Sequence, residues 1–139
     1  PSSISYTGNN RTHMIRIPDP GRFELRLMDG SANPYLLQAS VLASGIYGLK
    51  NKSDPGKPLH CNMYEDHEKY PNLPKLPDEL EQSLDQLENN KEMNEAFGKE
   101  VIKSYIKLRR SEIKEFKLKE NFDKKQSITN WEKNNTLDC

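Results

Sequence analysis

Three charged side chains alternate with apolar ones between positions 22 and 26. Arg22, Glu24 and Arg26 are separated by Phe23 and Leu25, and alternate residues of a β-strand share one face. The three charges would then project from that face about 7 Å apart, which is two residues' rise. Paired guanidinium N–H groups bind carboxylate or phosphate oxygens, and a carboxylate flanked by arginines stays ionised and can hold a divalent cation.

Two further arginines, Arg11 and Arg16, lie shortly before this segment and can add to the same anion-binding surface. The competing interpretation is a solvated sheet edge with cross-strand ion pairs, which contribute little to stability. Alternating charge is common on strands that face water, so the pattern alone favours this second interpretation.

A β-hairpin must position these charges. The segment 15–17 is apolar at both ends, and Pro18-Asp19-Pro20-Gly21 is a strong turn signal. Residues 22–27 then alternate without a fault, which places Phe23, Leu25 and Leu27 on the opposite face.

Helices are predicted after the hairpin. Asn33-Pro34 has the residue types of an N-cap and a first helical position. Residues 35–49 are apolar on nearly every side, which is typical of a helix buried in a larger body. Leu80, Leu84 and Leu87 predict an amphipathic helix, and a longer helix is predicted after Gly98.

The rest of the chain is predicted to be irregular. Five prolines between residues 53 and 77 indicate an ordered but irregular connection. Beyond about Lys119 the sequence is polar, with Trp131 and Leu137 as isolated apolar residues, and a frayed tail is expected. The expected division is therefore a domain over 1–118 and a polar tail over 119–139.

Composition excludes several classes of function. The chain has 139 residues, with 21 basic and 21 acidic side chains and a net charge of zero. A balanced charge argues against a general nucleic-acid binder or a binder of anionic membranes, and no apolar run is long enough to span a bilayer. Two cysteines, Cys61 and Cys139, favour a reducing compartment. The start at Pro1, without Met or a signal pattern, leads us to expect a fragment.

Three motifs together resemble the C-terminal part of the glutamine synthetase catalytic domain. They are NRTHMIRIP at 10–18, RFELR at 22–26 and DGSANPYL at 29–36, in the family's order and at similar spacing. Further matches are Gly45, residues 48–52, 55–56 and 108–112. The resemblance covers residues 9–118, and the form of the first motif is closest to the type III-like and glutamate–methylamine ligase branch. It implies an α+β fold in which a hairpin of the catalytic barrel is followed by packed helices.

The resemblance also implies a role for each charged residue. Arg11 matches an arginine that faces both glutamate and the ATP phosphates, and Arg16 and Arg22 match nucleotide-binding arginines. Glu24 matches a ligand of one of two divalent metals, Mg²⁺ or Mn²⁺, and Arg26 matches the arginine that binds the carboxylate of glutamate. The implied reaction joins glutamate and ammonia, or a small amine, at the expense of ATP, in glutamine biosynthesis and nitrogen metabolism.

The same resemblance implies that essential parts lie outside this chain. The other metal ligands, the flap acid and the N-terminal domain of the family would precede residue 1, and one carboxylate cannot hold two octahedral metals. We therefore expect no ligase activity from the chain alone. A cytoplasmic, ring-shaped homo-oligomer is implied for the complete protein, and a non-catalytic interaction or pseudo-enzyme module is the alternative. The choice between ammonia and methylamine stays open.

The five remaining candidate residues are three histidines, one cysteine and one tyrosine. His60, Cys61 and His67 match no common zinc spacing and lack a fourth ligand, so they are expected to be ordinary loop residues. For His13, packing or hydrogen bonding is favoured over catalysis, because it lies within a strand. Tyr64 aligns with a tyrosine that is adenylylated in some relatives, but the residues around it depart from that motif.

Overall fold

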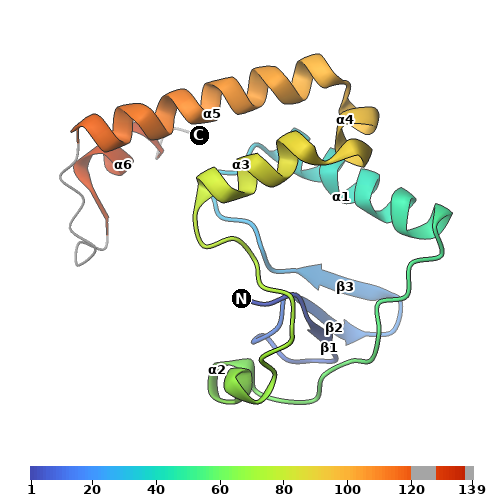
Figure 1. Cartoon of the computed structure of the whole chain (residues 1–139). Helices are drawn as coiled ribbons and strands as arrows, with labels where there is room; N and C mark the ends of the chain where they lie inside the picture. Colours follow the sequence, from blue (N-terminus) through green and yellow to red (C-terminus); the bar gives the residue numbers. More distant parts are fainter. Residues whose placement is uncertain (120–127, 137–139) are drawn as a thin grey trace. The chain divides into compact units, whose positions relative to one another are not determined.

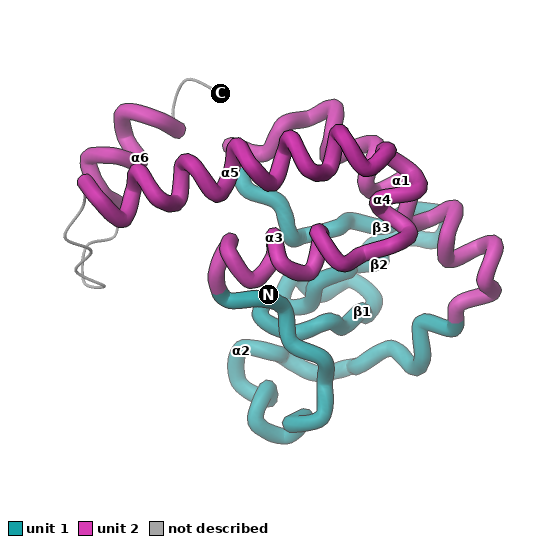
Figure 2. The backbone as a smooth tube through the Cα atoms, turned by 45° about the horizontal axis from the view of Figure 1, so that its top comes forward, with its two compact units in different colours: residues 1–29, 54–78 teal, residues 30–53, 79–139 magenta. Residues whose placement is uncertain are grey.

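The computed structural model describes residues 1–119 and 128–136. The chain divides into two compact units and passes between them three times, as the two colours of Figure 2 show. Unit 1 contains residues 1–29 and 54–78, and unit 2 contains residues 30–53 and 79–139.

Unit 1 is built on a three-stranded sheet in the order β1-β2-β3. Strand β1 (Tyr6–Thr7) runs parallel to β2 (Ile15–Asp19), and β2 pairs antiparallel with β3 (Arg22–Leu25) (Figure 1). The predicted hairpin is confirmed, although β3 ends two residues before the expected Leu27. Gly21 closes the turn with a φ of 80°, a conformation that glycine adopts without strain.

The segment 54–78 completes unit 1 by pairing with β1 and with the residues that precede it. Leu59 N donates to Tyr6 O at 3.0 Å, and Ser3 forms a β-bridge with Lys75. The segment also contains a short helix, α2 (Met63–Asp66), followed by the 3₁₀ turn η1 (His67–Lys69). Asn62 caps α2 by accepting a hydrogen bond from Tyr64 N, so the connection is less irregular than its prolines predict.

Unit 2 begins with the long helix α1 (Pro34–Lys50). The Asn33 side chain accepts hydrogen bonds from Tyr35 N and Leu36 N and Pro34 occupies the first helical position, which confirms the predicted start. No residue of α1 is buried, and Tyr35 and Leu49 are each 82% exposed. An all-round apolar helix is therefore only partly covered by the described residues.

The core of unit 2 lies between α3 (Leu80–Asn89) and α5 (Lys99–Lys119), which follows α4 (Lys91–Phe97). Leu84, Ile102 and Ile106 are buried there, and Leu87, Phe97, Tyr105 and Ile113 pack around them. Both predicted amphipathic helices are confirmed, but Leu80 is half exposed and lies outside this core. Arg110 of α5 binds both Asp85 and Glu88 of α3 at 2.7 Å.

Residues 128–136 form a capped helix rather than the frayed tail that their composition predicts. Helix α6 (Asn130–Asn135) starts with a capping box between Thr129 and Glu132, and the Trp131 ring meets Phe116 edge-on at 5.5 Å. Residues 120–127 and 137–139, with Leu137 and Cys139, lie outside the described residues. The α+β class is confirmed. Within the described ranges, no helix combines the length and apolar character needed to cross a bilayer.

Candidate functional site

The charged face of the hairpin is centred on Glu24. One carboxylate oxygen of Glu24 accepts a hydrogen bond from Arg16 Nη1 at 2.6 Å, and the other lies 3.4 Å from Arg26 Nη1. Arg16 and Glu24 are direct partners in the register of β2 and β3, so the strand pairing itself brings these two side chains together. The carboxylate is held between the guanidinium groups of Arg16 and Arg26.

Arg16 is the most enclosed charged group of this face, with its side chain 12% exposed. Its Nε donates to Asn9 Oδ1 at 2.9 Å, and its Nη2 donates to the same oxygen. These bonds fix the plane of the guanidinium group while Nη1 faces Glu24. Sequence reasoning missed Asn9, because the contact depends on residues before β2 folding back along it, and no local pattern marks that.

These contacts control the protonation of Glu24. The hydrogen bond from Arg16 is the largest cause that lowers the pKa of Glu24 below its ordinary value, partial burial opposes it, and Arg26 lowers the pKa further. Glu24 is therefore an anion at neutral pH, which agrees with the effect expected from flanking arginines.

Strand alternation predicts Arg22 and Arg26 beside Glu24, but the structure places Arg16 and Arg26 there. Arg22 binds Asp19 at 2.9 Å in an exposed pair, and Arg16 takes the expected place of Arg22 next to Glu24. Arg16 faces Glu24 through the register of the two strands, while an irregularity of the ladder between Arg16 and Asp19 places Asp19 opposite Arg22.

Arg11 takes part in this face through its backbone. Its carbonyl accepts a hydrogen bond from Arg26 Nε at 3.1 Å. Its side chain is exposed and forms no ion pair with any residue that the structure describes. The Arg11 guanidinium is therefore available to an anion, and the net charge of Arg11, Arg16, Glu24 and Arg26 together is positive.

A metal ion would need more ligands than this face offers. A carboxylate has about four lone-pair positions, so Glu24 can accept its two guanidinium contacts and still coordinate a cation. Within residues 1–119 and 128–136, however, no three His, Cys, Asp or Glu side chains gather in a way that could hold a metal. Since Mg²⁺ requires six ligands in octahedral geometry, the described residues alone do not fit a complete metal site.

The remaining candidate residues lie in the segments around strand β1 and helix α2 of unit 1. His13 is fully buried, with Nδ1 3.0 Å from Ser5 Oγ and Nε2 3.0 Å from the Cys61 carbonyl. The predicted hydrogen-bonding role is confirmed, but His13 lies in a bend before β2 and not within a strand. Cys61 is a free thiol, and His60 and His67 join no metal cluster in the described part of the chain. Tyr64 is 72% exposed.

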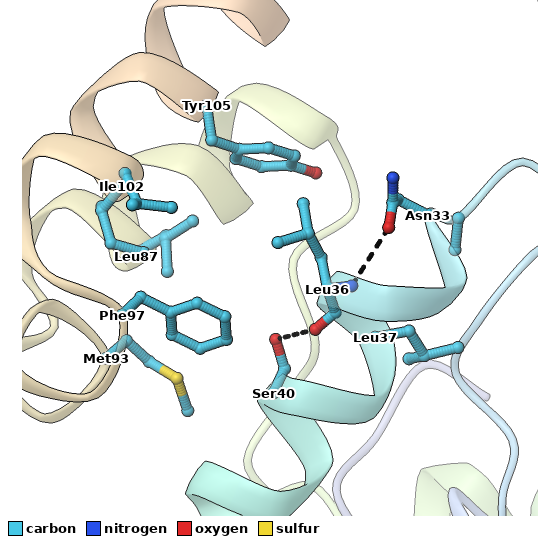
Figure 3. Close-up of a pocket in the computed structure, with 11 residues that line it drawn as sticks. Asn33, Leu36, Leu37, Ser40, Leu87, Met93, Phe97, Ile102 and Tyr105 are labelled. Carbon is cyan, nitrogen blue, oxygen red and sulfur yellow. Dashed lines mark hydrogen bonds between the residues drawn. The ribbon is translucent and has the colours of Figure 1, made fainter.

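Unit 2 contains an apolar pocket of about 250 Å³ between α1 and the α3–α5 helices. In Figure 3, Leu36 points from α1 toward Leu87 and Phe97. Two polar residues of the pocket are engaged with the α1 backbone: Asn33 Oδ1 caps the helix and Ser40 Oγ donates to Leu36 O at 2.7 Å. None of the lining side chains is charged, so this pocket lacks the groups that bind phosphate or carboxylate.

Comparison with known proteins identifies relatives over almost the entire chain. Residues 1–134 match the family model described as glutamine synthetase, catalytic domain. A glutamine synthetase of Rhizobium meliloti is 44% identical over 138 residues, and a glutamate–methylamine ligase of Methyloversatilis universalis is 36% identical over 141. Each alignment covers 99% of this chain and 30% of the relative.

Solved structures give the same result. A structure titled as a complex of GmaS with ADP matches with a TM-score of 0.80 and 40% sequence identity. The match covers 100% of this chain and 30% of the GmaS chain. A GmaS structure without ligand matches equally well. The chain thus spans about 30% of the length of the curated relatives that it matches.

Proposed function

Because this chain belongs to the glutamine synthetase family, we propose that it forms the C-terminal part of the catalytic domain of an ATP-dependent glutamate–ammonia ligase. In the proposed reaction, the side-chain carboxylate of glutamate attacks the terminal phosphate of ATP, and ADP leaves. Ammonia then attacks the γ-glutamyl phosphate, and inorganic phosphate leaves as glutamine forms. The observation that carries this proposal is the Glu24 carboxylate held between Arg16 and Arg26 on the hairpin.

We assign the substrate carboxylate to Arg26 and Arg11. Arg26 donates from Nε to a backbone carbonyl and from Nη1 toward Glu24, and a guanidinium has five N–H donors. In this proposal its other donors pair with the carboxylate of the substrate. Arg11 has an exposed guanidinium, so in this proposal it contacts glutamate and the ATP phosphates together.

Arg16 and Arg22 are assigned to the nucleotide. Arg22 pairs with Asp19 in an exposed contact, and exposed pairs contribute little free energy. A phosphate group can therefore take the place of Asp19 at small cost. These positive charges would stabilise the negative charge that develops on the transferred phosphoryl group, which is electrostatic catalysis.

Glu24 is assigned as a ligand of Mg²⁺ or Mn²⁺, which would neutralise phosphate charge when bound. Since the described residues do not complete a metal site, the other ligands would come from the part of the catalytic domain outside this chain. We therefore expect no turnover by the 139-residue chain alone.

The apolar surface of α1 supports a larger assembly. Tyr35, Leu42 and Leu49 are exposed. Exposed apolar patches usually mark a contact surface. We propose that the remainder of the domain covers α1 and that the complete protein is a homo-oligomer. The free Cys61 thiol suits the reducing cytoplasm.

Two alternatives are tested in the same experiments. The similarity to a glutamate–methylamine ligase and to GmaS favours methylamine as a second candidate acceptor. A non-catalytic interaction module would keep this fold without turning over ATP.

The test is expression of the longest open reading frame that includes this chain. Phosphate release is measured with ATP, glutamate and Mg²⁺, and with ammonia or methylamine as the acceptor. We expect turnover with one amine and its loss in Glu24→Ala, while Glu65→Ala, an exposed acid of the same unit, keeps the activity. Near-normal turnover of Glu24→Ala at saturating Mg²⁺ would contradict the metal assignment, and no turnover with either amine would favour the interaction module.

A further inference from the structure

The buried His13 has a fixed tautomer and a fixed orientation. Its Nε2 lies 3.0 Å from the Cys61 carbonyl, and a carbonyl oxygen only accepts, so Nε2 carries a hydrogen. In the neutral ring, Nδ1 then accepts a hydrogen bond from the Ser5 hydroxyl at 3.0 Å. Both nitrogens are used and the side chain is fully buried, which leaves no atom for a substrate.

The neighbours of His13 join the same two segments. Asn10 Nδ2 donates to the Cys61 carbonyl at 3.0 Å, and Met63 N donates to Thr12 Oγ1 at 3.0 Å. The Thr12 hydroxyl in turn lies 2.9 Å from Asn10 Oδ1. Three side chains of residues 10–13 thus bind the backbone of residues 61–63, and we call this set the clamp.

The clamped segment is also what holds Arg26. Arg26 Nε donates to the Arg11 carbonyl at 3.1 Å, and Arg26 N donates to the Met14 carbonyl at 2.9 Å. These two acceptors lie on either side of His13 in the sequence. A shift of residues 11–14 would therefore move both anchors of Arg26 at once.

We propose that His13 is a positioning residue: through the clamp it fixes the Arg11 carbonyl, and this carbonyl fixes the Arg26 guanidinium. The inference rests on the proposed function, in which the fixed Arg26 guanidinium aims its remaining donors at the carboxylate of glutamate. Binding by a paired guanidinium depends strongly on angle, so a small rotation of Arg26 would weaken it.

The test measures Arg26 directly in the 139-residue chain. Solvent exchange of the Arg26 Nε–H is followed by NMR in the wild type, in His13→Ala and in His13→Gln. His67→Ala serves as the matched control, because His67 is exposed and lies outside the clamp. Exchange occurs through local opening, so loss of the His13 hydrogen bonds should raise the rate about tenfold.

We expect about tenfold faster exchange in His13→Ala, partial recovery in His13→Gln, whose amide can still donate to the Cys61 carbonyl, and no change in His67→Ala. Unchanged exchange of the Arg26 Nε–H in His13→Ala would overturn the proposal. If His13→Ala unfolds unit 1, Thr12→Val removes the bond from Met63 N without touching His13. The same acceleration is then expected, and its absence also overturns the proposal.

Glutamate kinetics in the longer protein separate this inference from the proposed function. His13→Gln should raise the KM for glutamate more than the KM for ATP, with kcat less affected. Equal changes in both KM values would contradict positioning through Arg26. If no variant or wild type turns over substrate, the proposed function fails, while the exchange measurement still decides whether His13 positions Arg26.

Discussion

Among the described residues, unit 1 buries Ser5, Thr7 and His13 with one apolar side chain, Met63, whereas unit 2 buries Leu84, Ile102 and Ile106 with one polar side chain, Thr129. The interior of unit 1 is thus joined by hydrogen bonds, and that of unit 2 by apolar contact. Hydrogen bonds depend on angle as well as distance, while apolar burial depends mainly on area.

This difference in the interiors corresponds to a difference between the charged face of unit 1 and the packed helices of unit 2. In the site that we propose in unit 1, Arg16, Glu24 and Arg26 would act together on one bound anion. The hydrogen bonds that Arg16 donates to Asn9 and Arg26 donates to the Arg11 carbonyl fix the orientations of these two guanidinium groups. In unit 2, no charged side chain lines the pocket, and packing between helices is sufficient. A polar interior therefore accompanies the candidate site.

The largest expected effect is in the apolar unit. Leu84→Ala should lower the free energy of unfolding by about 2–5 kcal/mol, because it leaves a cavity beside Ile102 and Ile106. Urea denaturation followed by circular dichroism measures the loss. Leu80→Ala, in the same helix but half exposed, should cost far less. Equal losses would show that the core of unit 2 is not where we place it.

The next effect tests whether direction matters more than charge in unit 1. Arg26→Lys keeps the positive charge but loses the planar fork that binds the Arg11 carbonyl and Glu24 together. In the longer protein we expect a loss of about 1.5–3 kcal/mol in glutamate binding, measured by calorimetry. A fall in ATP affinity with unchanged glutamate affinity would mean that the roles of the arginines are interchanged.

A smaller effect is expected at the start of α1. Asn33→Ala removes the acceptor for Tyr35 N and Leu36 N and should cost about 1 kcal/mol. Hydrogen exchange at these two amides measures it, and Asn33→Asp should restore their protection because aspartate also caps helices. If Asn33→Ala leaves both amides protected, α1 depends on packing alone.

The smallest expected effect is the pH dependence of the Glu24 contacts. The pKa of Glu24 is lowered from 4.5, so the unfolded chain binds a proton at higher pH than the folded one. The stabilisation that the Glu24 ion pairs give to the folded chain is therefore fully present above pH 4.5. It is lost as the pH falls through the lower pKa of Glu24 in the folded chain. A carboxyl NMR titration, with Glu24→Gln to assign the signal, should give a midpoint below 4.5. A midpoint at or above it would contradict the ion pairs.

Local signals were enough to predict several elements. Pro20-Gly21 marks the hairpin turn, Asn33-Pro34 marks the start of α1, and Leu84 and Leu87 mark the inner face of α3, because each depends on a few neighbouring residues. The capping box of α6, Thr129 with Glu132, was also visible in the sequence, but the polar composition around it suggested a tail.

Contacts between distant segments could not be predicted in this way. Strand β1 has two residues and exists through its parallel partner, so no periodicity reveals it. Arg16 lies beside Glu24 because the two are register partners across β2 and β3, and one irregular step in the ladder places Arg22 opposite Asp19. The hydrogen bond between His13 and the Cys61 carbonyl joins residues 48 positions apart in the sequence, and only the folded unit brings them together.

The passage of the chain between the units has a consequence for evolution and for engineering. Neither unit is a continuous stretch of sequence, so neither corresponds to a single gene segment that could be duplicated, deleted or exchanged. A cut between residues 30 and 53 would leave unit 1 in two pieces, held by bonds such as Leu59 N to Tyr6 O and Leu76 N to Ser2 O. Recombination with a relative would therefore have to exchange both segments of a unit together, or all 139 residues at once.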